Sequence, residues 1–383
     1  MIDLVQPVSV VDPDEEAKGI EAGTALCLSG GGYRAMVFHL GALIRLNETG
    51  LLENLQRISS VSGGSITAAK LGLQWAKLNF QNRVATNLVE LVVDPIRDLA
   101  GRTIDGDSIL GGILTPGVSI SEKIVKAYRT HLLGDATLQD LPAEGRGPRF
   151  IINATNVQTG ALWRFSRPYM GDYKVGRIKD PTVAIAVAVA ASSAFPPVLS
   201  PLVLQLKHDD FTKDSSTVLQ TPPFTTEVVL SDGGVYDNLG LETAWKRYKS
   251  ILVSDGGGKM QPQAEPKRDW ARHALRINDI IDNQVRSLRK RQLIQGYEQK
   301  SDHNGAYWGV RSQLKDYPVQ IGLTCPDSAT VELASTPTRL KRLEPDYQER
   351  LINWGYAISS AAIASHYPGP ISAPLRFPYS RGV

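Results

Sequence analysis

The chain has 383 residues, of which 42% are hydrophobic and 21% are charged, and its formal net charge is +3. This composition is typical of a soluble globular protein and excludes a disordered or fibrous chain. The length fits one large domain or two modest ones, at about 100–200 residues per domain. So small a positive excess gives no indication of a nucleic-acid-binding protein, which would carry a concentrated basic face.

The cysteine content and the hydropathy indicate the cell compartment. Cys27 and Cys325 are too few for a disulfide framework or a four-cysteine zinc site. No stretch reaches the ~18 apolar residues that a membrane-spanning helix needs. Residues 1–17 carry acids and no basic residue, whereas a secretory signal begins with a basic region. We therefore expect a cytoplasmic protein without bound metal or cofactor, whose contact with any membrane is peripheral.

Strand-like and helix-like segments alternate from about residue 24 to residue 255, which predicts a layered α/β domain. The expected strands are residues 24–28, 57–61, 150–156, 161–165, 226–230 and 250–253. The expected helices are one that begins near Arg34 and stops at Gly50, and residues 65–78, 119–133, 181–191 and 238–248.

Changes in composition suggest three parts of the chain. Residues 1–21 form an acidic N-terminal segment, and residues 22–260 form the main domain. Within that domain, residues 84–118 are rich in Gly and Pro and are the candidate for a lid or insertion. Residues 261–383, with helical patterns over 270–300 and 346–366, are expected to form a mostly helical extension packed on it.

A glycine turn, Gly30-Gly31-Gly32, separates the first strand from the first helix. Such a turn leaves backbone amides free at the positive end of a helix, so it suits an anion. One candidate anion is a pyrophosphate, because Gly30-x-Gly32-x-x-Ala35 matches a relaxed dinucleotide fingerprint. The other is the oxyanion of an acyl-transfer intermediate. No acid closes the next strand, which disfavours the dinucleotide.

The run Ser60-Val61-Ser62-Gly63-Gly64 follows a strand and opens a helix, which is the setting of a nucleophile elbow. The sharp turn requires small residues on both sides of Ser62, and Ser60 and Gly64 are small. The usual pattern has Gly where this chain has Ser60. The spacing makes Ser62 the candidate nucleophile.

A serine nucleophile needs a base, and two similar runs offer one. Asp232-Gly233-Gly234 follows the strand at 226–230, and Asp255-Gly256-Gly257 repeats the pattern 23 residues later. The first run leads directly into an expected helix that Asp237 or Asn238 can cap. Local sequence alone leaves the choice between Asp232 and Asp255 open.

Taken in order, these motifs resemble those of the patatin-like phospholipase family. The family pattern is a Gly-Gly-Gly-x-Arg/Lys loop, a Gly-x-Ser-x-Gly elbow and an Asp-Gly-Gly run followed by Asn. The matching segments are residues 30–34, 60–64 and 232–238, and residues 190–196 resemble a further family block. The opening Ser-Gly-Gly-Gly-Tyr-Arg-Ala is also similar to that of the cytosolic phospholipase A2 catalytic domain. The resemblance covers about residues 22–258.

The resemblance implies a three-layer α/β/α sandwich around a mainly parallel sheet, and a Ser–Asp dyad without histidine. Ser62 would attack a fatty-acyl ester of a lipid or phospholipid, and Asp232 would take its proton. The amides of the glycine turn would hold the oxyanion, and water would release the fatty acid. Such a dyad needs Asp232 close to Ser62 and partly desolvated. The resemblance assigns supporting roles to Arg34, Gly64, Gly233 and Gly234. Arg34 would fix the loop or meet a lipid phosphate.

Two alternatives remain for the activity. One is an α/β-hydrolase-type esterase with a Ser-His-Asp triad, for which His273, His303 and His366 follow Asp232 in the chain. The other is a nucleotide-binding protein that uses the glycine turn.

The expected helix at 270–300 has a basic side and an apolar side. The basic side carries Arg286, Arg289, Lys290 and Arg291, and the apolar side carries Ile277, Ile280, Ile281, Val285 and Leu288. This pattern is found both in helices that lie on anionic membranes and in helices that pack on a domain. The sequence indicates neither the particular lipid nor the oligomeric state.

Overall fold

The computed structural model describes residues 20–105, 120–213, 217, 219–258, 260–299, 303–369, 371–372 and 376–383. Its strands are β1 (Glu21–Leu28), β2 (Arg57–Ser60), β3 (Phe80–Gln81), β4 (Val84–Ala85), β5 (Arg149–Asn156), β6 (Ala161–Phe165), β7 (Tyr169–Asp172), β8 (Gly176–Lys179), β9 (Leu202–Gln205), β10 (Glu227–Asp232), β11 (Tyr248–Asp255) and β12 (Asn304–Gly309). Its α-helices are α2 (Gly32–Glu48), α3 (Gly63–Gln74), α4 (Asp94–Ala100), α6 (Ile120–Tyr128), α7 (Ile185–Ser192), α8 (Gly234–Asp237), α9 (Glu242–Trp245), α10 (Trp270–Glu298), α11 (Asp327–Ala334) and α12 (Pro345–His366).

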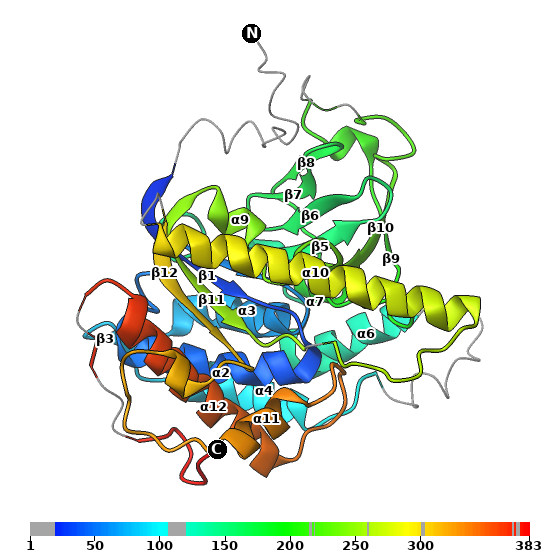
Figure 1. Ribbon diagram of the computed structural model, residues 1–383. Helices are drawn as coiled ribbons and strands as arrows, with labels where there is room; N and C mark the ends of the chain where they lie inside the picture. The colour runs from blue at the N-terminus through cyan, green and yellow to red at the C-terminus, as the bar shows by residue number, and fades with distance from the viewer. Residues whose placement is uncertain are drawn as a thin grey trace.

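The main sheet is mixed, with a parallel half and an antiparallel half (Figure 1). The neighbours β12, β11, β1, β2 and β5 are all parallel to one another. From β5 onward the sheet continues through antiparallel β6, β7 and β8, and β10 with β9 forms an antiparallel branch on β5. The parallel half carries the expected alternation of strands and helices, and the strands expected at 150–156 and 161–165 pair as a hairpin that begins the antiparallel half.

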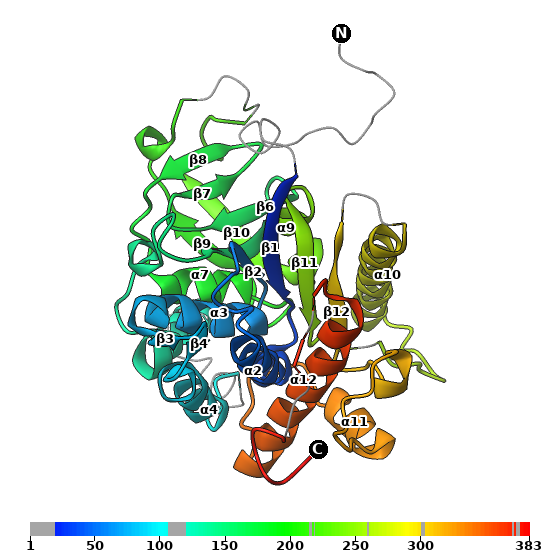
Figure 2. The same ribbon diagram turned by 90° about the vertical axis from the view of Figure 1, so that its left-hand side faces the viewer.

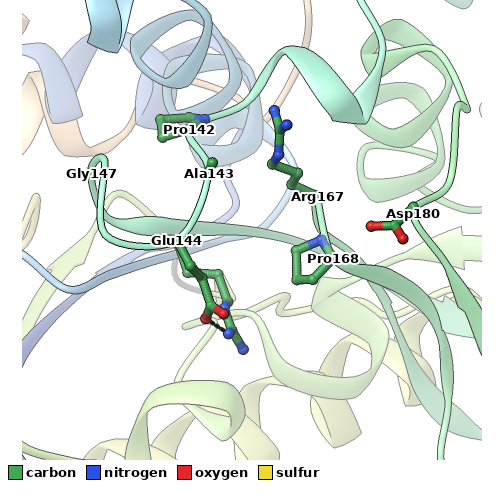
Figure 3. Close-up of a pocket in the computed structure, with 8 residues that line it drawn as sticks. Pro142, Ala143, Glu144, Gly147, Arg167, Pro168 and Asp180 are labelled. Carbon is green, nitrogen blue, oxygen red and sulfur yellow. Dashed lines mark ion pairs between the residues drawn. The ribbon is translucent and has the colours of Figure 1, made fainter.

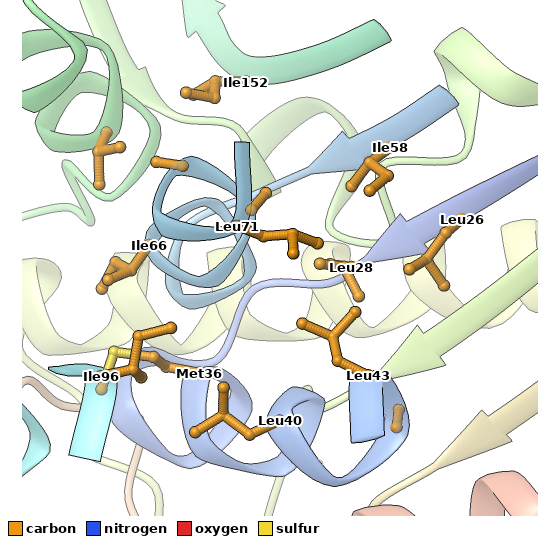
Figure 4. Close-up of a cluster of buried hydrophobic side chains, with 14 of the residues drawn as sticks. Leu26, Leu28, Met36, Leu40, Leu43, Ile58, Ile66, Leu71, Ile96 and Ile152 are labelled. Atoms are coloured by element: carbon orange, nitrogen blue, oxygen red, sulfur yellow. The ribbon is translucent and has the colours of Figure 1, made fainter. Parts of the chain in front are cut away.

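Helices cover both faces of the parallel half, as the side-chain alternation along β1 requires. Leu26 and Leu28 belong to a core that includes side chains of α2, α3 and α12, whereas Ala25 and Cys27 belong to a second core with α9 and α10. Figure 4 shows the first core, in which residues of β1 and β2 face the apolar side of α2. Figure 2 shows α10 on the far side of the sheet from α2. The expected three-layer sandwich is confirmed.

The C-terminal part of the chain contributes to this same architecture. Strand β12 extends the parallel half of the sheet at its edge, and α12 is buried against α2. The two helices approach so closely that a methyl group at Gly41 would collide with the carbonyl of Ile352, and one at Gly355 with the carbonyl of Phe38. Residues beyond 261 therefore form part of the main core.

One expected helix is interrupted in the structure. Residues 238–248 were expected to be continuous, but α8 ends at Asp237 and α9 begins at Glu242. Between them Gly240 has φ of 67°, a left-handed conformation that breaks a helix. The Asp237 carboxylate accepts the amide of Glu242 at 2.7 Å, so it supports the start of α9.

Two predictions concern segments that the described residues cover only partly. Of the candidate lid at 84–118, residues 84–105 form β4, a π-helical turn and α4, and the remainder lies outside the described residues. Residues 1–19 of the acidic segment also lie outside them. Within the described ranges, no helix combines the length and hydropathy needed to cross a membrane.

Candidate active site

Three strands, β1, β2 and β10, end close together beside the middle of β5. Leu28 pairs with Ser60 at the ends of β1 and β2, so the glycine turn and the elbow leave the sheet together. In β5, Ile152 pairs with Ser60, and Ala154, two residues further on, pairs with Asp232 at the end of β10. The strand register thus brings the elbow and Asp232 side by side.

Ser62 sits on a strained turn between β2 and α3. Its φ of 52° and ψ of −121° are uncommon for a residue with a side chain, and such strain is typical of functional sites. The turn is packed so tightly that a methyl group on Gly63 would collide with the carbonyl of Gly32, and one on Gly64 with that of Leu28. The elbow therefore requires glycine at 63 and 64.

A series of hydrogen-bonded serine hydroxyls connects the elbow to α7 and β5. The Ser62 amide donates to the Ser192 hydroxyl at 2.9 Å, and the Ser192 and Ser65 hydroxyls are also 2.9 Å apart. Ser65 donates to Ser60 at 3.0 Å, and Ser60 donates to the carbonyl of Ile151 at 3.1 Å. Because Ser65 has only one proton to give, Ser192 is the donor in its contact with Ser65. Ser60 thus uses its hydroxyl to tie the elbow to β5.

Asp232 is held on three sides and is almost completely buried. Its amide donates to Ala194 at 2.9 Å, its carbonyl accepts from the Thr155 hydroxyl at 2.8 Å, and its carboxylate accepts the Gly234 amide at 2.7 Å. The Ser62 side chain lies close enough to this carboxylate to lower its pKa. Burial raises the pKa of Asp232 to about 7, although the hydrogen bond from Gly234 and the Ser62 side chain lower it.

Asp255 has a different electrostatic environment. Its carboxylate lies 3.2 Å from Lys290 and 3.9 Å from Arg286, and it accepts the Tyr307 hydroxyl at 2.7 Å. Burial by itself raises the pKa of Asp255, but the two cations outweigh burial and hold the pKa well below its usual range. Asp255 is therefore committed to ion pairs that fix α10, whereas Asp232 forms no ion pair with any described residue.

The glycine turn lies directly against Ser62. A methyl group on Gly30 would come within 3.1 Å of the Ser62 Cβ and would collide with the Asn238 side chain. The Gly30 amide already donates to the Asn238 carbonyl at 3.0 Å. Gly31 and Gly32 have φ of 145° and 59°, and their amides donate to no acceptor among the described residues. Two of the three amides in this turn are thus available to an anion.

Arg34, the last residue of this motif, turns away from the solvent. Its Nε donates to the Gly256 carbonyl at 2.9 Å and Nη2 to the Thr338 hydroxyl at 3.0 Å, and Nη1 donates to the Thr336 carbonyl. Burial lowers the pKa of Arg34 to about 10, so it stays charged at neutral pH. These contacts fix the glycine turn to the ends of β11 and α11, and they leave Arg34 only 2% exposed.

The family of the chain follows from comparison with known proteins. The model of the patatin-like phospholipase family matches residues 26–245, which is more than half of the sequence. The chain belongs to this family. The three motifs at 30–34, 60–64 and 232–238 all fall inside the match. No curated protein matches the sequence.

Solved structures show the same fold. Human GIVD cytosolic phospholipase A2 superposes with a TM-score of 0.52 at 15% identity, over 91% of this chain and 59% of that chain. The same human enzyme in complex with methyl gamma-linolenyl fluorophosphonate gives a TM-score of 0.50 at 14% identity, over 88% of this chain and 57% of that one. The chain thus spans less than two thirds of the human enzyme, and the likeness concerns the fold.

The structure adds His39 to this patatin-like site, although no sequence motif had marked it. His39 is fully buried in α2, where Nε2 is 3.0 Å from the Ser29 carbonyl and Nδ1 is 2.7 Å from the Ser254 hydroxyl. Trp308 donates its indole N–H to the same hydroxyl at 2.9 Å. Because the Ser29 carbonyl can only accept, the proton of the neutral His39 ring resides on Nε2, and Nδ1 accepts the proton of Ser254. Burial lowers the pKa of His39 to about 4, which keeps the ring neutral.

Asn238 is the second addition. Its side-chain oxygen lies between Gly30 and Gly234, where methyl groups would meet it, and its carbonyl holds the Gly30 amide. The sequence marked Asn238 as a helix cap and as the end of the third motif. In the structure, Asn238 lies between the glycine turn and the Asp232-Gly233-Gly234 run.

The three histidines of the alternative triad lie away from Ser62. His303 contacts the carbonyl of Tyr248, at the start of β11, and stacks on Trp245 with ring centroids 3.9 Å apart. The start of β11 is the opposite edge of the sheet from the elbow. His273 is exposed on α10, and His366 is the last residue of α12.

A hollow of about 140 Å³ exists elsewhere on the molecule (Figure 3). Arg149, which lines it, begins β5 and pairs with Arg57 at the start of β2, so the hollow lies at the sheet edge opposite Ser62. Arg149 forms an ion pair with Glu144, and Arg167 donates to the carbonyls of Gln139 and Leu141. These contacts occupy Glu144, Arg149 and Arg167, and the hollow lies apart from the site around Ser62.

Proposed function

We propose that the chain is a serine acyl hydrolase that cleaves fatty-acyl esters of lipids or phospholipids with Ser62 as nucleophile and Asp232 as base. The observation that carries this proposal is that the strand register brings the buried Asp232 carboxylate beside Ser62 on its strained turn, close enough for the Ser62 side chain to lower the pKa of Asp232. A carboxylate of ordinary pKa is a weak base at pH 7. Burial raises the pKa of Asp232 to about 7, close to the value that favours proton transfer at that pH.

The first step forms an acyl-enzyme. Asp232 accepts the proton of Ser62 as the Ser62 oxygen attacks the ester carbonyl, and a tetrahedral oxyanion results. The free amides of Gly31 and Gly32 donate to this oxyanion, assisted by the positive end of the α2 dipole. The ester C–O bond then breaks, and the proton on Asp232 passes to the leaving alkoxide.

The second step returns the enzyme to its starting state. Asp232 takes a proton from a water molecule, whose oxygen attacks the acyl carbon. Collapse of the second tetrahedral intermediate releases the fatty acid and returns the proton to Ser62. Gly30 is left out of the oxyanion hole because its amide already donates to Asn238, and its role is to allow the close approach to Ser62.

The substrate class implies contact with a membrane or another lipid aggregate. Long-chain lipids are presented to water-borne enzymes as surfaces, so the site has to meet such a surface. We therefore include peripheral membrane contact in the proposed function.

The test compares hydrolysis by wild type, Ser62→Ala, Asp232→Asn and Asp255→Asn, on a soluble short-chain ester and on phosphatidylcholine vesicles. Ser62→Ala and Asp232→Asn should each lower kcat by about 10³-fold or more, as removal of a nucleophile or its base does. Asp255→Asn is the matched control, because it alters the buried carboxylate of the second Asp-Gly-Gly run. Circular dichroism verifies the fold of each variant. A folded Ser62→Ala that hydrolyses as fast as wild type would refute the proposal.

A further inference from the structure

Helix α10 has the most exposed surface of any long helix in the described part of the chain. Of its 29 residues, only Leu293 and Gly296 are buried. Figure 1 shows it crossing the outside of the molecule, with its first turns projecting beyond the neighbouring elements, and Figure 2 shows it as the outermost layer on its side. An isolated amphipathic helix gains most of its stability from a partner for its apolar face.

Apolar side chains form a stripe along the uncovered side of α10. Trp270 is 86% exposed, and Ile277, Ile281 and Leu288 are 41%, 55% and 56% exposed. Their spacings of seven, four and seven residues place all four on one face of the helix. Trp270 begins the helix at its projecting end. This stripe is the largest group of exposed apolar side chains on any described helix.

The other side of α10 is attached to the body by ion pairs. Arg286 and Lys290 contact Asp255, and Arg289 contacts Glu242 at 3.0 Å and Asp237 at 3.6 Å. Arg286 and Arg289 therefore anchor the helix to the body, as in the alternative in which this helix packs on the domain. The exposed cations lie elsewhere, near the projecting end and beside the last part of the stripe. They are Lys267, Arg268, Arg272 and Arg291.

The attached side of α10 borders the proposed active site. Arg289 lies over the ring of Tyr236, four residues after Asp232, with its guanidinium carbon 5.6 Å from the ring centre. Asp282 is close enough to Asp232 for their charges to repel each other. Val235, which follows the Asp-Gly-Gly run, is 55% exposed. The proposed active site therefore lies next to α10.

We propose that the stripe of Trp270, Ile277, Ile281 and Leu288, with the cations Lys267, Arg268, Arg272 and Arg291, docks on an anionic phospholipid surface beside Ser62. This inference rests on the proposed function for the idea that a lipid surface is the substrate. The charge pattern favours lipid over a second copy of the chain. In a symmetric dimer through this face, the cations of both copies would be brought together and repel. On lipid, the apolar stripe enters the interface and the cations meet phosphates.

The test measures binding with the full-length Ser62→Ala protein, so that the vesicles stay intact. Flotation is carried out with vesicles of equal parts phosphatidylcholine and phosphatidylglycerol, and with vesicles of phosphatidylcholine alone. The stripe variant carries Ile277→Ser, Ile281→Ser and Leu288→Ser, and the charge variant carries Lys267→Glu, Arg268→Glu and Arg272→Glu. The matched control carries Val319→Ser and Val331→Ser, which are also exposed apolar residues but lie outside α10. Circular dichroism verifies the helix content.

The stripe variant should lose at least tenfold in partitioning to the anionic vesicles, and the control should bind like Ser62→Ala alone. The charge variant should lose the preference for phosphatidylglycerol. Brominated lipids should quench the fluorescence of Trp270, and this quenching should disappear in Trp270→Phe. Unchanged partitioning of the stripe variant would overturn the proposal, as would a stripe variant that instead dissociates an oligomer on a sizing column. The soluble-ester test of Ser62 and Asp232 is independent, so failure of either proposal is distinguishable.

Discussion

The buried carboxylate of Asp232 lies beside Ser62, whose side chain lowers its pKa, and no lysine or arginine among the described residues pairs with it. The second Asp-Gly-Gly run shows the opposite pattern, because Asp255 is held by Lys290 and Arg286. Two runs of the same sequence thus carry carboxylates whose pKa values shift in opposite directions. This contrast selects Asp232 as the proposed base and yields several predictions.

The activity should depend on pH through Asp232. A base must be ionised to accept a proton, and the pKa of Asp232 is raised to about 7. We expect kcat/KM for a soluble ester to rise as the pH increases and to reach half its maximum near pH 7. The measurement is a pH–rate profile between pH 5 and 9. A rate that stays constant down to pH 5 would show that the base has an ordinary carboxyl pKa.

Asp232→Asn should be more stable than wild type above pH 7. The folded carboxyl keeps its proton up to about pH 7, whereas the unfolded one releases it near pH 4, so stability falls as the pH rises through this window. A shift of about three pKa units corresponds to at most about 4 kcal/mol, which the neutral amide avoids. Urea unfolding of both proteins at pH 8 measures the gain. The gain should vanish at pH 4, and a less stable variant at pH 8 contradicts the assignment.

Asp255→Asn should have the opposite effect on stability while keeping activity. The lowered pKa of Asp255 means that its ion pairs stabilise the fold above about pH 4 and are lost as the pH falls further. Their removal should cost about 2 kcal/mol at pH 7, less than a fully buried pair because Lys290 is partly exposed. Thermal unfolding measures the loss, and the ester assay measures the activity. A fully stable but inactive variant would make Asp255 the base.

His39→Gln should lower kcat more than it changes KM. His39 holds the Ser29 carbonyl at the start of the glycine turn, so its loss should misalign the amides of Gly31 and Gly32. We expect about a 10- to 100-fold lower kcat on the soluble ester, typical for a residue that orients a donor. Nitrogen NMR of the wild type should show a neutral ring protonated at Nε2 from pH 8 to pH 5. A charged ring at pH 6, or an unchanged kcat, contradicts the positioning role.

The sequence allowed the motifs to be located because each one lies at the end of one strand. Residues 24–28 of β1 and 58–60 of β2 are all apolar or small, which identifies these strands, and the Gly-rich or Ser-rich runs that follow mark where they leave the sheet. The buried environment of Asp232 and the ion pairs of Asp255 come from residues far away in the chain. Their opposite pKa shifts therefore became visible only in the fold.

Long-range packing explains the features that the sequence did not reveal. Strand β12 contains Gly305 and Gly309, which weaken the strand pattern of its sequence. It joins the sheet by pairing with β11. Helix α12 was predicted, but its burial against α2 depends on close approach at Gly41 and Gly355. His39 lies on an apolar helix face and resembles an ordinary core residue. Its role appears only when Ser29 and Ser254 are brought around it.

Covalent labelling identifies the nucleophile without reference to any substrate. A fluorophosphonate with a lipid-like chain reacts only with an activated serine, and intact-mass spectrometry followed by peptide mapping locates the adduct. We predict one phosphonyl group on Ser62 of the wild type and none on Ser62→Ala. Asp232→Asn should be labelled at least 100-fold more slowly, because the nucleophile then lacks its base. Labelling at any other residue, or none at all in the folded wild type, would contradict the assignment of Ser62 as nucleophile.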